Sequence, residues 1–80
     1  MAGRDWSEVV EEAVRRHVDS TGDPVFTRQE LIDGEMNRIV SETGSEGATP
    51  HQTLSRELQQ LRDTGVIELV DDRGTYRLIG

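Results

Sequence analysis

The chain has 80 residues and a formal net charge of −7, so it is expected to form one small domain (residues 1–80) with a limited core. It contains no cysteine and only two histidines, far apart in the sequence, which argues against a disulfide framework and a bound metal. The longest apolar runs are two or three residues, too short to span a membrane, and no signal peptide is visible. We therefore expect a cytoplasmic protein without a cofactor.

The first predicted element is an amphipathic helix over about residues 5–19. Its apolar stripe contains Trp6, Val9, Val10, Ala13, Val14, His17 and Val18 at helical spacing. Trp6 could serve as a stacking platform and His17 as a ligand or base, but their place in the stripe favours core packing for both. Residues 20–24 have the composition of a turn.

The second helix is predicted over about residues 27–40, after a short strand at Val25-Phe26. Thr27 and Glu30 form a capping box, and Phe26 before the cap can pack on Leu31. The expected core residues of this helix are Leu31, Ile32, Met36, Ile39 and Val40. Gly34 weakens the middle of the helix and Glu35 falls near its apolar side, a conflict that a bend would resolve. Residues 41–48 are predicted to be a loop.

The third helix is predicted over about residues 50–64. Thr49 is the expected N-cap, Pro50 occupies the first helical position, and Gly65 ends the helix. Its apolar side carries Leu54, Leu58 and Leu61, whereas the opposite side and its flanks carry Gln52, Ser55, Arg56, Gln59, Gln60 and Asp63. Arg, Gln and Ser are side chains that hydrogen-bond to base edges in the major groove of DNA. An ordinary solvated helix surface is the alternative interpretation.

A β-hairpin is predicted over residues 66–79, with a tight turn at residues 71–74. Ile67 and Leu69 alternate with Glu68, which predicts one buried face and one solvated face. Arg73 at the turn and Arg77 on the outer face are candidate phosphate contacts, although two aspartates precede Arg73.

This order of elements predicts an α+β fold, the winged helix-turn-helix, with three helices and a small antiparallel sheet that includes the hairpin wing. In that fold the third helix commonly enters a DNA groove and the wing touches the DNA backbone. The candidate DNA-binding residues are Thr49, His51, Gln52, Ser55, Arg56, Gln59, Arg73 and Arg77.

The negative charge is unusual for a DNA-binding protein, but it is uneven. Residues 1–48 hold 5 Arg against 11 acids (−6), while residues 49–80 hold 4 Arg against 5 acids (−1). All nine basic residues are Arg. An acidic, lysine-free composition resembles that of proteins from salt-accumulating halophiles. An acidic surface that binds a protein is the competing explanation.

The segment from Thr49 to Val70, followed by residues 73–78, resembles the C-terminal winged-helix domain of methyl-directed and Dam-replacing restriction endonucleases. The resemblance lies in Leu58-Gln59-Gln60-Leu61-Arg62-Asp63-Thr64-Gly65 and in Arg73-Gly74-Thr75-Tyr76-Arg77, and it covers about residues 25–79. In that family the domain recognises adenine-methylated duplex DNA. The resemblance implies that Gln52, Ser55, Arg56 and Gln59 contact the DNA here.

The chain departs from that family in having neither a nuclease domain nor any lysine for its metal site. It also lacks a Ser-His-Asp set, a phosphate-binding Gly loop and an HExxH helix, so we expect no enzymatic activity and no small-molecule substrate. The predicted function is binding of double-stranded DNA, as a small regulator or a recognition module. The alternatives are protein–protein interaction or homodimerisation through the acidic first helix, and a degenerate restriction-enzyme remnant without a specific target.

Overall fold

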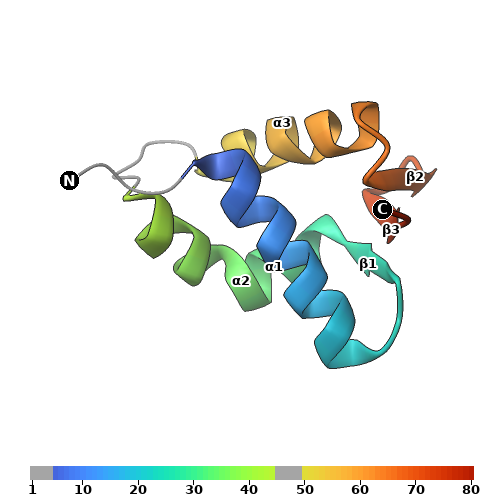
Figure 1. The fold of residues 1–80 in the computed structure, drawn as a ribbon, viewed down its shortest axis with the longest axis horizontal. Helices are drawn as coiled ribbons and strands as arrows, with labels where there is room; N and C mark the ends of the chain where they lie inside the picture. The colour runs from blue at the N-terminus through green and yellow to red at the C-terminus, as the bar shows by residue number, and fades with distance from the viewer. Residues whose placement is uncertain (1–4, 45–49) are drawn as a thin grey trace.

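The computed structural model describes residues 5–44 and 50–80, which form three helices and a three-stranded antiparallel sheet (Figure 1). In chain order the elements are α1 (Trp6–Thr21), β1 (Val25–Thr27), α2 (Arg28–Thr43), α3 (Pro50–Asp63), β2 (Ile67–Asp71) and β3 (Thr75–Leu78). The α+β class predicted from the sequence is confirmed. The order of helices and strands is compatible with a winged-helix-like arrangement.

Helix α1 begins and ends with caps that its sequence supplies. The Asp5 side chain accepts a hydrogen bond from the Ser7 backbone N–H at 3.4 Å. At the other end Gly22 takes the left-handed conformation (φ 73°) and its N–H donates to the Val18 carbonyl at 2.8 Å. The helix therefore continues two residues beyond the predicted end at residue 19, because the glycine determines where it stops.

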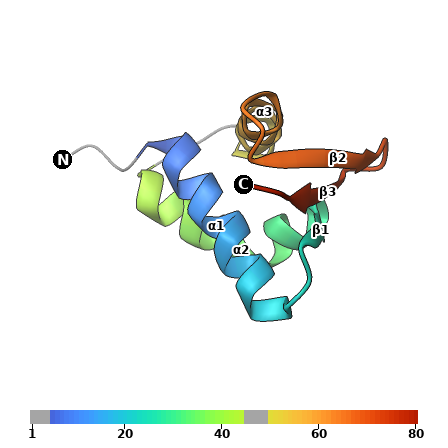
Figure 2. The same ribbon diagram turned by 45° about the vertical axis from the view of Figure 1, so that its right-hand side comes forward.

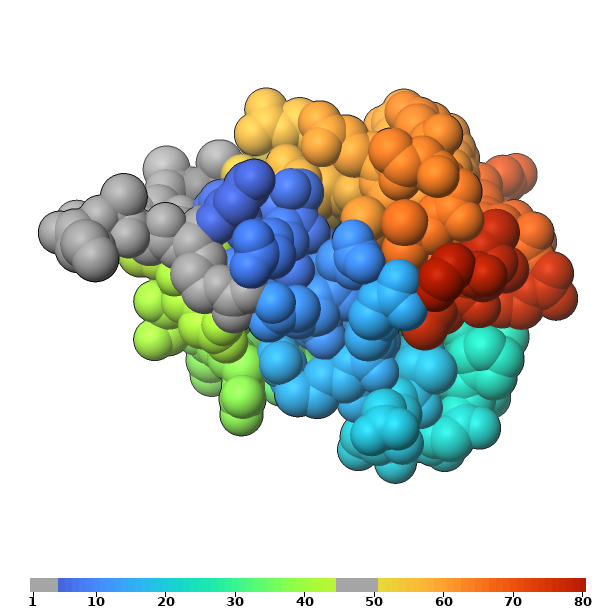
Figure 3. Space-filling model, viewed as in Figure 1, coloured from blue at the N-terminus to red at the C-terminus, as the bar shows by residue number. Residues whose placement is uncertain are grey.

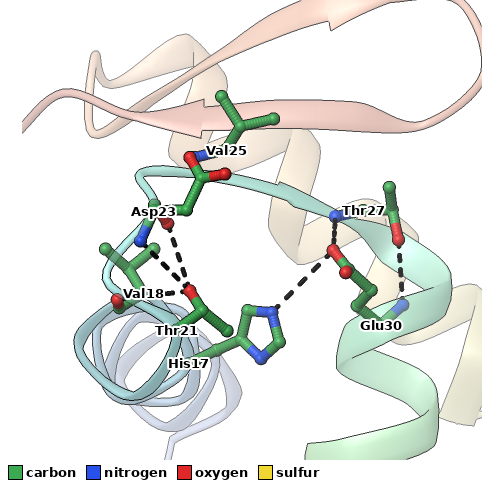
Figure 4. A network of polar contacts seen from close by, with 7 residues as sticks. All are labelled: His17, Val18, Thr21, Asp23, Val25, Thr27 and Glu30. Carbon is green, nitrogen blue, oxygen red and sulfur yellow. Dashed lines mark hydrogen bonds and ion pairs between the residues drawn. The ribbon is translucent and has the colours of Figure 1, made fainter.

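The capping box at the start of α2 is confirmed, and its Glu30 also approaches α1 (Figure 4). Thr27 Oγ1 accepts from the Glu30 N–H at 3.0 Å, and Glu30 Oε1 accepts from the Thr27 N–H at 2.8 Å. The same Glu30 oxygen lies 3.8 Å from His17 Nε2 of α1. The largely buried His17 thus faces the first turn of α2 across the helix pair.

The predicted loop at residues 41–48 is wrong for its first three residues, because α2 continues to Thr43. The Thr43 hydroxyl donates to the Ile39 carbonyl at 2.8 Å, and Gly44 ends the helix in the left-handed conformation with its N–H on Val40. The polar residues there form a partly exposed last turn of helix rather than a loop.

The conflict at Glu35 is resolved by an ion pair between α1 and α2. Arg16 Nε and Nη2 both donate to Glu35 Oε1, at 3.1 and 2.5 Å. This hydrogen bond raises the pKa of Arg16 above its ordinary value. Glu35 can therefore lie close to the apolar side of α2, which is a single helix through Gly34.

The core forms where the three helices meet the inner face of the sheet. Its buried residues are Val9, Val10, Ala13, Val14, Phe26, Leu31, Met36, Ile39, Leu54, Leu58, Leu61 and Ile67. Trp6, Ile32 and Val40 pack against this cluster while partly exposed, so the core-packing prediction for Trp6 is confirmed. Helix α1 covers the middle of one face of the molecule, between α2 and α3 (Figure 3).

Strand β3 lies between β1 and β2 and pairs antiparallel with both. Phe26 lies opposite Tyr76, and their rings stack with centroids 5.7 Å apart. The pairing continues beyond β1, because the Arg28 N–H donates to the Gly74 carbonyl at 2.9 Å. The start of α2 is thereby attached to the turn of the β2–β3 hairpin. The predicted short strand at Val25-Phe26 is confirmed and includes Thr27.

No helix within residues 5–44 and 50–80 is long and apolar enough to cross a membrane. The same part of the chain holds no group of three His, Cys, Asp or Glu residues arranged to bind a metal ion.

Replacing Gly34 by Ala is expected to raise the free energy of unfolding by about 0.5–1 kcal/mol, because alanine favours a helix interior. A β-carbon at this exposed position meets no atom within 4 Å. Urea denaturation followed by circular dichroism measures the change.

The matched control is Gly22→Ala, which is expected to lower the free energy of unfolding by about 1 kcal/mol because an L-residue is strained in that left-handed conformation. Equal effects of the two substitutions would contradict this account of α1 and α2.

Candidate nucleic-acid interface

Helix α3 has one buried side and one exposed side, as its sequence predicts. Leu54 and Leu58 are fully buried and Leu61 is almost so, which fixes the rotation of the helix about its axis. The side chains predicted to contact DNA from the opposite side are exposed: His51, Gln52, Arg56 and Gln59. Gln52, Arg56 and Gln59 can hydrogen-bond to base edges, and His51 can donate to a phosphate, without leaving the helix surface.

Ser55 differs from the other predicted contacts. It is half-buried, and its hydroxyl donates to the His51 carbonyl at 3.1 Å within the helix. Its oxygen can still accept a hydrogen bond, but its proton is engaged. Thr49, the predicted N-cap and phosphate contact, lies outside the described residues, so its role stays a prediction.

The turn of the hairpin presents Arg73 on a well-defined backbone. The Asp71 carboxylate accepts a hydrogen bond from the Arg73 N–H at 2.8 Å, and Gly74 takes a positive φ of 83°. One of the two aspartates that appeared to oppose a phosphate contact therefore shapes the turn. The exposed side chain of Arg73 extends from this turn.

Arg77 lies on the other face of the sheet. It stands in register with Val25 and Glu68, whereas the neighbouring Tyr76 stands in register with Phe26 and Leu69 on the inner face. Its guanidinium pairs with Glu68 across the two strands. The two arginines predicted as phosphate contacts in the hairpin are thus separated, and only Arg73 faces α3.

A groove of about 520 Å³ runs between α3 and the hairpin. Figure 2 shows α3 nearly end-on, with the hairpin extending to one side of it and α1 on the other. The lining residues come from α2, α3 and the hairpin: Arg28, Ser55, Gln59, Arg62, Leu69, Asp72, Arg73, Gly74 and Tyr76. We call this the α3–hairpin groove.

Arg28 and Arg62 are members of the groove that the sequence did not identify. Ser55, Gln59 and Arg62 follow the i, i+4, i+7 spacing of one helical stripe, so the position of Arg62 was available from the sequence. Arg28 was not, because only the hydrogen bond between its N–H and the Gly74 carbonyl brings it to the hairpin turn. No ion pair joins Arg62 to another described residue.

The α3–hairpin groove is positive in a negatively charged chain. It is lined by three arginines and one aspartate, whereas the chain as a whole has 9 basic and 16 acidic residues. Within the described residues, no ion pair engages Arg28, Arg62 or Arg73, in contrast to Arg15, Arg16 and Arg77, which each pair with a glutamate. The three arginines that converge on this groove therefore have no carboxylate partner among residues 5–44 and 50–80.

Leu69 corrects the expectation of a wholly buried inner face on β2. It is 36% exposed although it lies on the same face as the buried Ile67. The hairpin extends past the helical core at this point, so the inner face of its outer half lines the groove instead of the core.

No protein-family model, curated protein or solved structure matches this chain. The functional argument therefore rests on the charges, exposure and geometry of α3 and the hairpin.

Replacing Asp71 by Ala is expected to lower the free energy of unfolding by about 1 kcal/mol, because the Arg73 N–H loses its acceptor. The matched control is Asp72→Ala, since the Asp72 side chain has no hydrogen bond to another described residue. Thermal unfolding of the two variants measures the difference, and equal stability would show that the Asp71 contact does not order the turn.

Proposed function

We propose that this chain is a winged-helix domain that binds double-stranded DNA, with α3 in the major groove and the hairpin as its wing. The observation that supports this most strongly is the pairing of an exposed Gln-Arg-Gln surface on α3 with the basic α3–hairpin groove beside it. The positive charge of the groove contrasts with the net charge of −7 of the whole chain.

In this proposal the two features have different tasks. Arg56 can bind a guanine edge through two hydrogen bonds, and Gln52 and Gln59 can do the same with adenine. Arg73 binds the phosphate backbone and positions α3, a contact that carries little sequence information. Arg77 contributes less to phosphate binding than Arg73, because it must break its ion pair with Glu68 to reach a phosphate.

The family resemblance supports the same proposal. Leu58, Leu61 and Ile67, which belong to the shared motif, are buried, and Gly65 and Gly74 have positive φ values that suit a helix end and a turn. The motif residues thus have structural tasks that suit a winged helix. We propose adenine-containing duplex sites as the first targets to test, with and without methylation.

The acidity of the chain suits a halophilic source in this proposal. At molar salt the Debye length falls to about 3 Å, so repulsion between acidic surfaces and DNA is screened. The gain from counterion release also shrinks, and affinity then depends on base contacts and shape. A few arginines placed beside α3 suffice under these conditions.

A second candidate function is protein–protein contact. The outer face of the sheet and its neighbourhood expose apolar side chains, with Val25 38%, Val70 51% and Ile79 53% exposed. The acidic α1 provides a polar surface elsewhere on the molecule. In this alternative the chain associates through these surfaces, and α3 contributes only to the core.

The double variant Arg56→Ala/Gln59→Ala is expected to lower affinity for the preferred duplex by at least about thirtyfold, because two base contacts of about 1–3 kcal/mol each are lost. The preferred duplex is first selected from a random pool, with and without adenine methylation. Fluorescence anisotropy with that duplex measures the change.

The matched control is Arg38→Ala/Gln29→Ala, which removes the same two side-chain types from exposed positions on α2, away from α3. Its affinity is expected to stay within about twofold of the original, as for surface substitutions elsewhere. Equal affinities of the two folded variants, or no enrichment in the selection, would favour the protein-contact function.

The salt dependence of DNA binding is expected to be shallow. The three groove arginines give a logarithmic slope of about −3, because each neutralised phosphate contributes about −0.9. Anisotropy titrations between low and high salt measure the slope. A slope of about −6 or steeper would show a wider phosphate interface than α3 and the hairpin provide.

A further inference from the structure

The α3–hairpin groove is larger and more varied than a contact for one phosphate requires. Its volume of about 520 Å³ lies in the range of pockets that hold a small organic molecule. Its lining combines guanidiniums with an amide, a hydroxyl, an aromatic ring and an aliphatic side chain. The occupant must therefore carry negative charge and also an apolar face.

The apolar part of the groove continues the core outward along the inner face of the sheet, and we call it the ledge. Phe26, Tyr76 and Leu69 stand side by side across the three strands, and their exposure rises from fully buried through half-buried to 36%. Phe26 stacks on Tyr76 and holds the ring in place. The ledge offers a flat, fixed surface for a ring of the occupant.

The charged part lies around this ledge. Arg62 comes from α3, Arg73 from the hairpin turn and Arg28 from the start of α2, so three separate elements direct cations to one groove. The Arg28 N–H is bound to the Gly74 carbonyl, which fixes the distance between two of these elements. Guanidiniums bind phosphate through paired hydrogen bonds.

We propose that the α3–hairpin groove binds a nucleotide unit, with its phosphate on Arg28, Arg62 and Arg73 and its sugar or base against Tyr76 and Leu69. Gln59 and Ser55 provide polar contacts from α3 to the same unit. Asp72 is the one carboxylate in the lining, and it weakens phosphate binding by repulsion.

The nucleotide unit can come from two sources. The first is the backbone of the DNA strand beside α3, and this source rests on the proposed function. The second is a free nucleotide, which requires no DNA binding. The shared chemistry is a phosphate ester attached to a sugar ring.

The test uses the full chain and four probes at low salt: deoxyadenosine monophosphate, deoxyadenosine, inorganic phosphate and the selected duplex. Changes in amide chemical shifts locate each probe, and titration gives its affinity. The monophosphate is expected to shift Gln59, Leu69 and Arg73 resonances and to bind at least about fivefold more tightly than phosphate or the nucleoside, because only it satisfies both parts of the groove. Equal binding of phosphate alone would overturn the proposal.

Variants then show whether Arg62 and Arg73 bind the phosphate of the monophosphate. Arg62→Gln/Arg73→Gln is expected to weaken binding of the monophosphate at least about tenfold, as loss of charged hydrogen bonds implies. The control Arg38→Gln leaves binding unchanged. Asp72→Asn is expected to strengthen binding about twofold to fivefold, a gain that misfolding cannot produce. Unchanged binding in both groove variants would overturn the proposal.

The duplex arm separates this proposal from the proposed function. Competition between the duplex and the monophosphate supports the strand as the source, whereas monophosphate binding without duplex binding supports the free nucleotide and overturns the DNA function. If the groove variants bind the duplex as tightly as the original chain and no variant binds the monophosphate, the nucleotide site is overturned and the DNA function is left intact.

Discussion

The pairing of β1 with β3 is the constraint on which the rest of the structure depends. It joins the helical first half of the chain to the hairpin at its end, through the Phe26–Tyr76 stack and the hydrogen bond from the Arg28 N–H to the Gly74 carbonyl. A two-stranded hairpin alone is marginally stable in water, so the third strand gives the sheet its fixed position. The hairpin can then extend beyond the core without losing its orientation relative to α3.

This constraint also explains how a polar site can form in so small a domain. Helix α3 is fixed in rotation by its leucines, and the hairpin is fixed by β1, so the space between them has two rigid walls. Side chains from three elements reach that space, and each element contributes one arginine to it. Rigid placement matters for recognition, because the cost of ordering flexible side chains is subtracted from affinity.

Much of the fold follows from local sequence signals. The Thr27–Glu30 capping box, the leucine stripe of α3 and the glycines at helix ends and at the turn each have a physical meaning that does not depend on distant residues. The end of α2 was misplaced because polar residues indicate exposure and do not distinguish a helix turn from a loop. The exposed side of α3 was also predicted, because the helical spacing of its leucines defines the opposite side.

The α3–hairpin groove was predicted only in part, because it depends on contacts between distant segments. Arg28 reaches it only through the pairing of β1 with β3, and Leu69 leaves the core only because the outer half of the hairpin extends past the helical core. The separation of Arg73 from Arg77 required the strand register, which fixes which face each side chain takes.

The register shift between Leu69 and Asp71 has a consequence for the edge of the sheet. Strand β2 is the outer neighbour of β3, and its free edge is regular only up to this irregularity. A bulge bends and twists a strand, so a second chain cannot continue straight pairing past it. The salt-bridged Glu68 places a charge within the remaining regular stretch. The longest exposed edge of the sheet is therefore a poor template for strand addition, which protects copies of this chain from edge-to-edge aggregation.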